Sequence, residues 1–335
     1  MVTIKDIARE CNVSFSTVSK ALKNSPEISA EKTKFIQEKA EKMGYHPNIA
    51  AQTLRTNRTY DIGVIFEDKT GSGFQHQYFA TVISGIQKIA QEKGYEMTFI
   101  GRSSSSDFDY YTHVRGRNYD GIAILSCDFK SAAIKKLVQS DIPTVTLDYF
   151  YDKNHTTIMS DYEKGIEELL EYVIANGHKK IAMIHGEDTL VTNQRIKAFK
   201  KICENHNLSI PDDYFAEGLY HDPFTSAEAT NVLLSLPNPP TCIFYPDDYA
   251  ALGGIRELNS RGLKPGKDIS IVGYDGIMLT SMMIPPLTTY EQPGLQIGEM
   301  MAEHLIANIE KSDEYKPKKV LVNGRLLKGA TIVKI

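Results

Sequence analysis

Several acidic side chains and one arginine stand directly after short apolar runs of the chain, or open the segment that follows one. They are Asp148, Asp247, Asp248, Asp275 and Arg195. Carboxylates accept hydrogen bonds from hydroxyl groups, and a guanidinium donates several in a fixed geometry. For any one aspartate alone, a helix cap or a loop charge is the commoner explanation. The set as a whole predicts a binding site for a polyhydroxylated small molecule.

A second group of polar residues, near the N-terminus, has the composition of a nucleic-acid contact. Ser16, Thr17, Ser19 and Lys20 fall on the polar side of a predicted short helix. Such hydroxyl and ammonium groups bond base edges or phosphates in a major groove. The first 58 residues hold ten Lys and Arg against six Asp and Glu, although the whole chain has a net charge of −4. This asymmetry indicates that only the head meets a polyanion.

Three short helices are predicted to position the polar groups of the head. Thr3 and Asp6 match a capping box and begin the first helix. Ser29 caps the third helix, which ends at Gly44. Two helices joined by a tight turn and braced by a third make a helix-turn-helix unit. A small bundle that packs on its own protein is the alternative that this pattern leaves open.

The segment 47–58 is predicted to form a short hinge helix with a small apolar seam. A helix of this length is marginal alone in water and needs a partner copy or DNA to become ordered. Its Leu54 is suited to wedge between base steps from the minor groove. We therefore expect residues 1–46 to form the DNA-binding head.

Apolar runs and helical stretches alternate through the rest of the chain. This alternation predicts an α/β core of parallel sheets covered by helices on both faces. The core, 61–335, is long enough for two lobes. We place one near 61–160 with a return near 291–320, and the other near 161–290 with the C-terminal segment. Ligands of such sheets bind beyond the carboxyl ends of the strands, where the aspartates stand.

Signatures of enzymes, metal sites and membrane spans are weak or absent in the sequence. Gly71–Gly73 lacks the third glycine of a dinucleotide fingerprint and the ending of a P-loop. The four cysteines are far apart, and the nine histidines form no His-Glu-x-x-His, so we expect no metal, cofactor or disulfide framework. Neither an apolar run of roughly 18–20 residues nor a secretory h-region is found, which favours a cytoplasmic location.

Four segments of the head form a long, ungapped pattern: Ile4–Ala8, Asn12–Ser14, Ser16–Leu22 and Gly44–Asn48. This pattern resembles the lactose/galactose repressor (LacI/GalR) family of bacterial transcriptional regulators. Parts of the body are similar to the family core: Gly177–Ala182, Pro239–Thr241, Asp248–Gly253, Asp268–Asp275 and Pro285–Thr289. The resemblance implies a dimeric repressor with a helix-turn-helix head, a hinge helix and a two-lobed core like that of periplasmic binding proteins.

The resemblance also implies, by position, which head residues touch DNA. Residues that would face base edges are Phe15, Ser16 and Lys20. Residues that would contact phosphates are Thr3, Thr17, Ser19 and Ser29. Residues that would belong to the hinge helix are Asn48, Ala51 and Leu54, with Leu54 as the minor-groove wedge. Phe15 and Lys20 depart from common family choices, so the operator sequence stays open.

Ligand contacts in the core are implied in the same way. Arg195 and Asp275 look like the strongest contacts, followed by Asp148 and Asp247. Tyr78 and Phe79 would line the wall of the first lobe, and Tyr149 stands beside Asp148. Asp247 occupies a place where Asn is frequent, and a carboxylate there favours hydroxyl-rich or cationic ligands. Tyr149 occupies a place where purine-binding relatives can carry a stacking Trp, and this chain contains no Trp.

Together these observations predict a repressor of carbohydrate-utilisation genes rather than an enzyme. Two chains would pair through their cores and present two heads to a pseudo-palindromic operator. A sugar-like effector between the lobes would control that binding, and a dimer is expected because no heptad tail is present. A purine co-repressor is the alternative within this interpretation. Outside it, the alternatives are a solute-binding protein, whose lobes look alike, and a sugar-converting enzyme.

Overall fold

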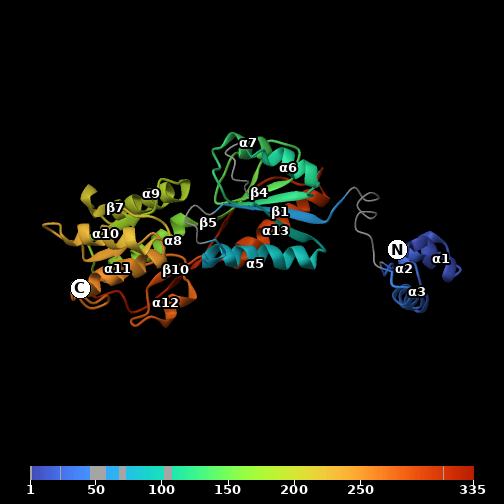
Figure 1. The fold of residues 1–335 in the computed structure, drawn as a ribbon. Helices are drawn as coiled ribbons and strands as arrows, with labels where there is room; N and C mark the ends of the chain where they lie inside the picture. The colour runs from blue at the N-terminus through green and yellow to red at the C-terminus, as the bar shows by residue number, and fades with distance from the viewer. Residues whose placement is uncertain (1, 23, 46–57, 68–72, 102–107, 312) are drawn as a thin grey trace. The chain divides into compact units, whose positions relative to one another are not determined.

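The computed structural model of the chain describes residues 2–22, 24–45, 58–67, 73–101, 108–311 and 313–335. It divides into two compact units, Met1–Thr59 and Tyr60–Ile335, each with its own hydrophobic core (Figure 1). The expected hinge contacts Asn48, Ala51 and Leu54 lie outside the described residues.

The described residues of the first unit form the helices α1 (Ile4–Glu10), α2 (Phe15–Leu22) and α3 (Ala30–Lys42). The Asp6 amide donates to the Thr3 hydroxyl, and the Thr3 amide donates to the Asp6 carboxylate at 2.9 Å, which completes the predicted capping box. The three helices pack through a small apolar core made of Ile7, Ala8, Val18, Ala21, Ile36 and Ala40. The helix-turn-helix fold predicted from the sequence is thus confirmed.

The first lobe of the second unit is a six-stranded parallel sheet with the order β11-β5-β4-β3-β1-β2. Its strands are β1 (Asp61–Phe66), β2 (Glu96–Ile100), β3 (Gly121–Ser126), β4 (Thr144–Leu147), β5 (Thr156–Ser160) and β11 (Lys319–Val322). α5 (Gln77–Glu92), preceded by the short helix η1 (Gly73–Gln75), and α13 (Gly294–Glu310) cover one face (Figure 1). α6 (Tyr110–Arg117) and α7 (Ala132–Val138) cover the other.

The second lobe is a four-stranded parallel sheet with the order β7-β6-β8-β9. Its strands are β6 (Ile181–His185), β7 (Phe215–Glu217), β8 (Cys242–Phe244) and β9 (Ser270–Val272). α8 (Tyr162–Ala175) and α9 (Leu190–Asn205) pack on one face, and α10 (Pro223–Leu234) and α11 (Asp248–Ser260) on the other. The short helices η2 (Asp212–Tyr214) and α12 (Met278–Met282) precede β7 and follow β9. The predicted α/β core with two covered parallel sheets is confirmed.

The chain crosses between the two lobes three times. It leaves β5 for α8, it returns from β10 (Thr289–Glu291) to α13, and it leaves β11 for β12 (Arg325–Leu327). β10 and β12 pair antiparallel as a separate two-stranded ribbon. Since β5 and β11 leave the first lobe at their carboxyl ends, the crossovers start from the edge where ligands of parallel sheets bind.

Candidate functional site

A cavity of about 290 Å³ lies between the two lobes of the core unit. Six of the seven ligand contacts expected from the sequence line it: Tyr78, Phe79, Asp148, Tyr149, Arg195 and Asp275. The lining also includes residues that the sequence did not single out, among them His76, Phe129, Tyr162, Tyr220 and Gln292. The structure therefore brings carboxylates of both lobes and one guanidinium together at the carboxyl ends of the strands.

Asp148 supplies the carboxylate of the first lobe and stands at the end of β4. Its backbone has a φ of 56°, a left-handed conformation that turns the chain away from the strand. The Tyr78 hydroxyl donates to Oδ2 at 3.3 Å, and the Ser160 amide donates to Oδ1 at 3.2 Å. Burial raises the pKa of Asp148 to about 6, although these donors favour its ionised form.

Asp275 supplies the carboxylate of the second lobe and follows β9. Gln292 donates from Nε2 to its Oδ1 at 2.6 Å, and the Asp275 amide donates to the Tyr290 carbonyl. Its φ of 111° is rare for a residue with a side chain, and these bonds hold it in place. Burial, together with the charges of Asp247 and Asp248, raises the pKa of Asp275 well above its usual range.

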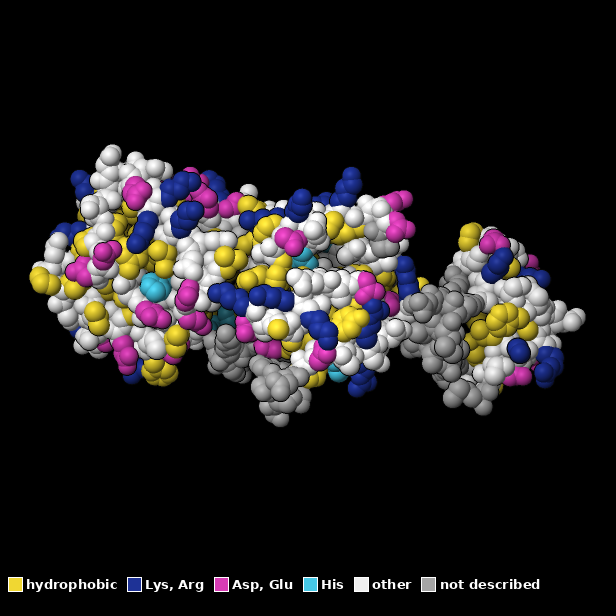
Figure 2. Space-filling model, turned by 90° about the horizontal axis from the view of Figure 1, so that it is seen from above, with side chains coloured by type: hydrophobic (Ala, Val, Ile, Leu, Met, Phe, Trp, Pro, Cys, Tyr) yellow, Lys and Arg dark blue, Asp and Glu magenta, His cyan; other side chains and the backbone are white. Residues whose placement is uncertain are grey.

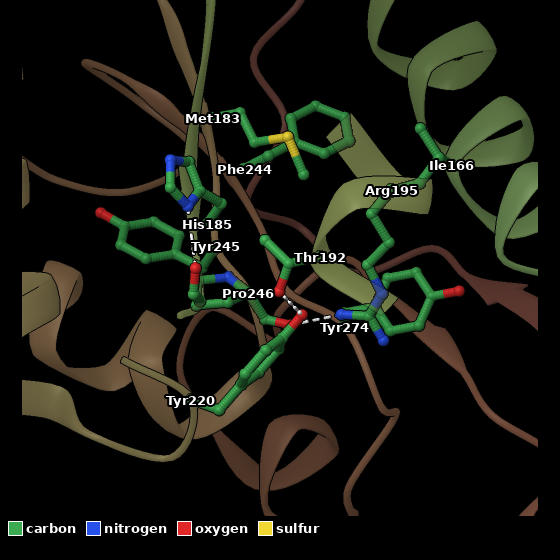
Figure 3. A pocket seen from close by; sticks show the side chains of 11 residues that line it. Ile166, Met183, His185, Thr192, Arg195, Tyr220, Phe244, Tyr245, Pro246 and Tyr274 are labelled. Carbon is green, nitrogen blue, oxygen red and sulfur yellow. Dashed lines mark hydrogen bonds between the residues drawn. The ribbon is translucent and has the colours of Figure 1, made fainter. Parts of the chain in front are cut away.

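Arg195 lies on α9 and is only 4% exposed. Figure 3 shows its guanidinium beside Tyr274 and its hydrogen bond to the Pro246 carbonyl, which is 2.7 Å long. The guanidinium carbon lies 3.7 Å from the centre of the Tyr274 ring and 4.9 Å from that of Tyr162. Nε is buried and finds no hydrogen-bond partner among the described residues. The aromatic rings thus fix the orientation of a buried cation in a cavity that Asp148 and Asp275 also line.

Asp247, the seventh expected contact, does not line the cavity. It caps α11: Oδ1 accepts from the Ala250 amide at 2.8 Å and Oδ2 from the His221 amide at 2.6 Å. The side chain is 1% exposed, so both oxygens serve the protein's own backbone. Asp248 is also buried and accepts from the Thr289 hydroxyl at 2.6 Å. Neither residue meets the expectation of a free carboxylate at a strand end.

Aromatic side chains form the walls of the cavity. Tyr149 stacks on Phe129 with ring centres 4.6 Å apart and planes 6° from parallel. His76 of the first lobe stacks on His221 of the second at 4.2 Å, which brings the two lobes into contact beside the cavity. A flat ring, or the apolar face of a sugar ring, fits such walls.

The residues that the resemblance assigns to DNA contact lie on the polar side of the head. Phe15, Ser16 and Lys20 on α2 are exposed, Phe15 by 47%. Thr17 is half-buried, and its hydroxyl lies 2.8 Å from that of Ser14. Lys20 forms an ion pair with Glu27 on the next turn of chain. The exposed face of α2 therefore offers one aromatic ring, hydroxyls and a cation.

Two further phosphate contacts were expected at helix starts, and both side chains are exposed there. The Thr3 hydroxyl caps α1, and the Ser29 hydroxyl accepts from the Lys32 amide at 3.4 Å at the start of α3. Ser19 is half-buried on α2. On the face of the core unit shown in Figure 2, basic and acidic side chains alternate rather than gather by sign.

Among the residues that the structure describes, neither a membrane-spanning helix nor a metal-ligand cluster is found. None of the helices that the structure describes is long and apolar enough to cross a membrane. No group of three or more His, Cys, Asp or Glu placed to hold a metal ion occurs among those residues either. The cavity and the exposed face of α2 remain the two candidate sites.

Comparison with protein families matches both units of the chain. The family described as "Bacterial regulatory proteins, lacI family" matches residues 3–48, and the "Periplasmic binding protein-like domain" matches residues 170–332. Among curated proteins, the chain is 35% identical to the "Probable HTH-type transcriptional repressor ExuR" of Bacillus subtilis, over 96% of each chain. It is 30% identical to "Catabolite control protein A" of Priestia megaterium, over 92% of this chain and 93% of that protein.

Solved structures extend the similarity across the whole fold. The Lac repressor dimer bound to operator and the anti-inducer ONPF superposes with a TM-score of 0.81 at 24% identity, over 99% of each chain. A complex of the transcriptional regulator CelR with cellobiose superposes with a TM-score of 0.75 at 20% identity, over 99% of this chain and 100% of that one. At these identities the two structures confirm the fold alone.

Proposed function

The chain belongs to the lacI family of bacterial regulatory proteins and is a DNA-binding transcriptional repressor, and we propose that a sugar-like molecule in the interlobe cavity controls its binding to an operator. Because members of this family regulate transcription, membership of the family also rules out the alternative of a sugar-converting enzyme. We further propose that the controlled genes serve carbohydrate use.

One observation carries the proposal: Asp148, Arg195 and Asp275, from different elements of both lobes, line a single cavity. Neighbouring hydroxyls of a sugar donate to the carboxylates and accept from the guanidinium, so one ligand satisfies groups of both lobes. A relative of the same fold is described in complex with cellobiose, and another with bound ribose. A ligand that bridges the lobes favours one angle between them, and this preference is what allosteric coupling requires.

The head is proposed to bind DNA through the exposed face of α2. Phe15, Ser16 and Lys20 would meet base edges. Phosphate contacts are proposed for Thr3, Thr17, Ser19 and Ser29. The hinge helix 47–58, with Asn48 and Ala51, would enter the central minor groove, and Leu54 would open a base step there. Wedges of this kind bend DNA by roughly 20–90°.

The functional form is proposed to be a homodimer on a pseudo-palindromic operator. Large apolar side chains of α12 and the residues after it are exposed: Met278, Leu279, Met282 and Ile284. Ile284 is 99% exposed, and such clusters on a soluble unit commonly mark contact surfaces. A dimer places two heads on two half-sites, which doubles the number of phosphate contacts and steepens the dependence of binding on salt.

Selection of duplexes from a random library by the full chain tests the first half of the proposal. We expect a pseudo-palindromic site, bound with an affinity that falls steeply as salt rises. Leu54→Ala is expected to weaken that binding and to remove most of the bend in a gel-shift assay. A full chain that prefers no duplex over bulk competitor DNA would contradict the DNA-binding role.

A thermal-shift panel of sugars, sugar acids, sugar phosphates and purines tests the second half. We expect a member of the sugar classes to raise the melting temperature and to change the operator Kd by about 5–150-fold, a typical range for allosteric coupling. A purine is the second candidate, because relatives at 28–30% identity are described as the repressor PurR and the Phe129–Tyr149 wall accepts a flat ring. A panel in which only purines bind would replace the sugar with a purine co-repressor.

A further inference from the structure

Two of the three crossovers between the lobes carry buried polar side chains that bond to each other. Ser160 ends β5, and Gln292 follows β10. The Ser160 hydroxyl donates to Gln292 Oε1 at 2.6 Å, although 132 residues separate them in the sequence. Ser160 is 1% exposed and Gln292 7%. This hydrogen bond therefore ties together two of the segments that must move when one lobe rotates against the other.

Each member of the pair also bonds to one of the cavity carboxylates. Gln292 donates from Nε2 to Asp275 at 2.6 Å, and the Ser160 amide donates to Asp148 at 3.2 Å. The result is a continuous chain of hydrogen bonds, Asp275–Gln292–Ser160–Asp148, which we call the junction relay. It begins in the second lobe, passes through two crossovers and ends in the first lobe.

We propose that Gln292 and Ser160 are positioning residues. Through them, the junction relay transmits a change in the hydrogen bonding of Asp275 to the β5 crossover and to Asp148. The relay rests on the proposed function, since it concerns the same cavity. A ligand hydroxyl that donates to Asp275 shares with Gln292 the same acceptor carboxyl, and so weakens the bond from Gln292. The ligand thereby changes the bond that holds the crossover.

The amide of Gln292 makes this coupling directional. Its Oε1 can only accept and its Nε2 can only donate, so each end of the amide needs the partner that it has. If Asp275 no longer accepts the hydrogen bond from Gln292, the buried Nε2 group loses its partner. Rotation of the side-chain amide away from Ser160 then becomes favourable. Backbone bonds support the same link, because the Gln292 amide donates to the Asp275 carbonyl at 3.1 Å.

Hydrogen exchange of the full-length chain, with neither operator nor sugar present, tests the relay. The readout is the exchange of the peptide 156–164, which contains the end of β5 and the crossover to α8. Asp275→Ala is expected to raise exchange there by about tenfold, the size expected when a buried donor loses its hydrogen-bond partner. In a Gln292→Leu background, Asp275→Ala is expected to add no further rise, because the relay is already broken.

Asp247→Ala is the matched control for this comparison of single and double variants. It removes the same kind of buried carboxylate from the neighbouring strand end of the same lobe, but Asp247 is no part of the relay. It is expected to raise exchange near the start of α11 and to leave 156–164 unchanged. Ser160→Ala breaks the relay at the other crossover. It replaces Gln292→Leu in the comparison of single and double variants if Gln292→Leu does not fold.

Two results would overturn the relay. One is an equal effect of Asp275→Ala with and without Gln292, which would mean that the two residues act independently. The other is a rise at 156–164 in Asp247→Ala, which would reflect general loosening of the lobe. Because the test uses no DNA and no ligand, its failure is distinct from a failure of operator selection or of the sugar panel.

Discussion

Asp247 and Asp275 follow neighbouring parallel strands of the same sheet, yet their side chains have different roles. Asp247 follows β8 and uses both oxygens to cap α11 and to hold the His221 amide. Asp275 follows β9, lines the interlobe cavity and accepts from Gln292. Both are carboxylates at the edge where ligands bind, and only one of them faces the ligand space.

The residues that come next explain the difference. After Asp247 a helix begins at once, and its free amide groups bind the nearest carboxylate. After Asp275 comes Gly276, with a φ of 69°, and the next helix, α12, begins at Met278, where the Ile277 amide donates to Asp248 rather than to Asp275. A Cβ at Gly276 would lie 2.5 Å from the Glu291 backbone, so only glycine lets this turn pass so close to β10. A strand-end carboxylate is therefore free for a ligand when the amides of the following helix start do not bond to it.

The largest effect that tests this contrast is on ligand binding. Asp275→Ala is expected to weaken binding of the best sugar of the panel by at least about 100-fold, since it removes a buried acceptor and leaves Gln292 Nε2 without its partner. Operator affinity without sugar is expected to stay within about threefold of wild type. Isothermal titration with the sugar and a gel shift with the selected operator measure the two quantities.

Asp247→Ala is the paired measurement in the same two assays. It is expected to keep most of the sugar affinity, because its oxygens do not reach the cavity. A loss of sugar binding equal to that of Asp275→Ala would erase the distinction between the two strand ends. A normal sugar response in Asp275→Ala would count against the cavity assignment itself.

The next effect is on stability. Asp247→Ala is expected to lose more stability than Asp275→Ala, the reverse of their order in loss of sugar affinity. Asp247→Ala removes the acceptor of the Ala250 and His221 amides, and it is expected to lower the free energy of unfolding of the core by roughly 3 kcal/mol. Asp275→Ala removes the acceptor of one side-chain hydrogen bond, from Gln292, and is expected to cost less. Thermal unfolding followed by calorimetry compares them. An equal cost for both would indicate that Asp247 is no more structural than Asp275.

Much of the head and of the sheets was predictable because the signals are local. The Thr3–Asp6 capping box and the apolar spacing of α1 to α3 involve residues three or four apart, and the structure contains them. The buried runs of β1, β3 and β6 stand out as continuous apolar stretches. Six of the seven expected ligand contacts line the cavity, since residues after parallel strands meet at one edge.

The remaining features depend on partners that are distant in the sequence. β5 gives no apolar run, because it begins with Thr156 and Thr157, and it is buried between β4 and β11. Gln292 shows no local signal, because its contacts are with Ser160, 132 residues away, and with Asp275. Strand-end position alone also does not show that the Asp247 side chain caps a helix.

A smaller effect separates the head from the core. Lys20→Ala removes an exposed cation of α2 and is expected to weaken operator binding by about tenfold, with the loss concentrated on one position of each half-site. Sugar affinity, measured by titration in the absence of DNA, is expected to be unchanged. Glu27→Ala is the matched control, because it removes only the ion-pair partner of Lys20 and leaves the ammonium free for DNA. A change in sugar affinity in Lys20→Ala would contradict the division of labour between the units.

A pH-dependent effect concerns Asp248, the buried carboxyl beside the Asp247 cap. Burial raises its pKa to about 7 in the folded chain, whereas an unfolded aspartate titrates near 4. Between these values the folded state binds the proton more tightly. This group's contribution to stability therefore falls as pH rises from about 4 to 7, by at most about 1.4 kcal/mol per pH unit.

Asp248→Asn removes this titration while its amide oxygen can still accept from Thr289. The variant is expected to be less stable than wild type at pH 5 and to close that gap by pH 7.5, by a few degrees in melting temperature. Calorimetry of both chains at several pH values measures the gap. A gap that does not change with pH would mean that Asp248 stays ionised.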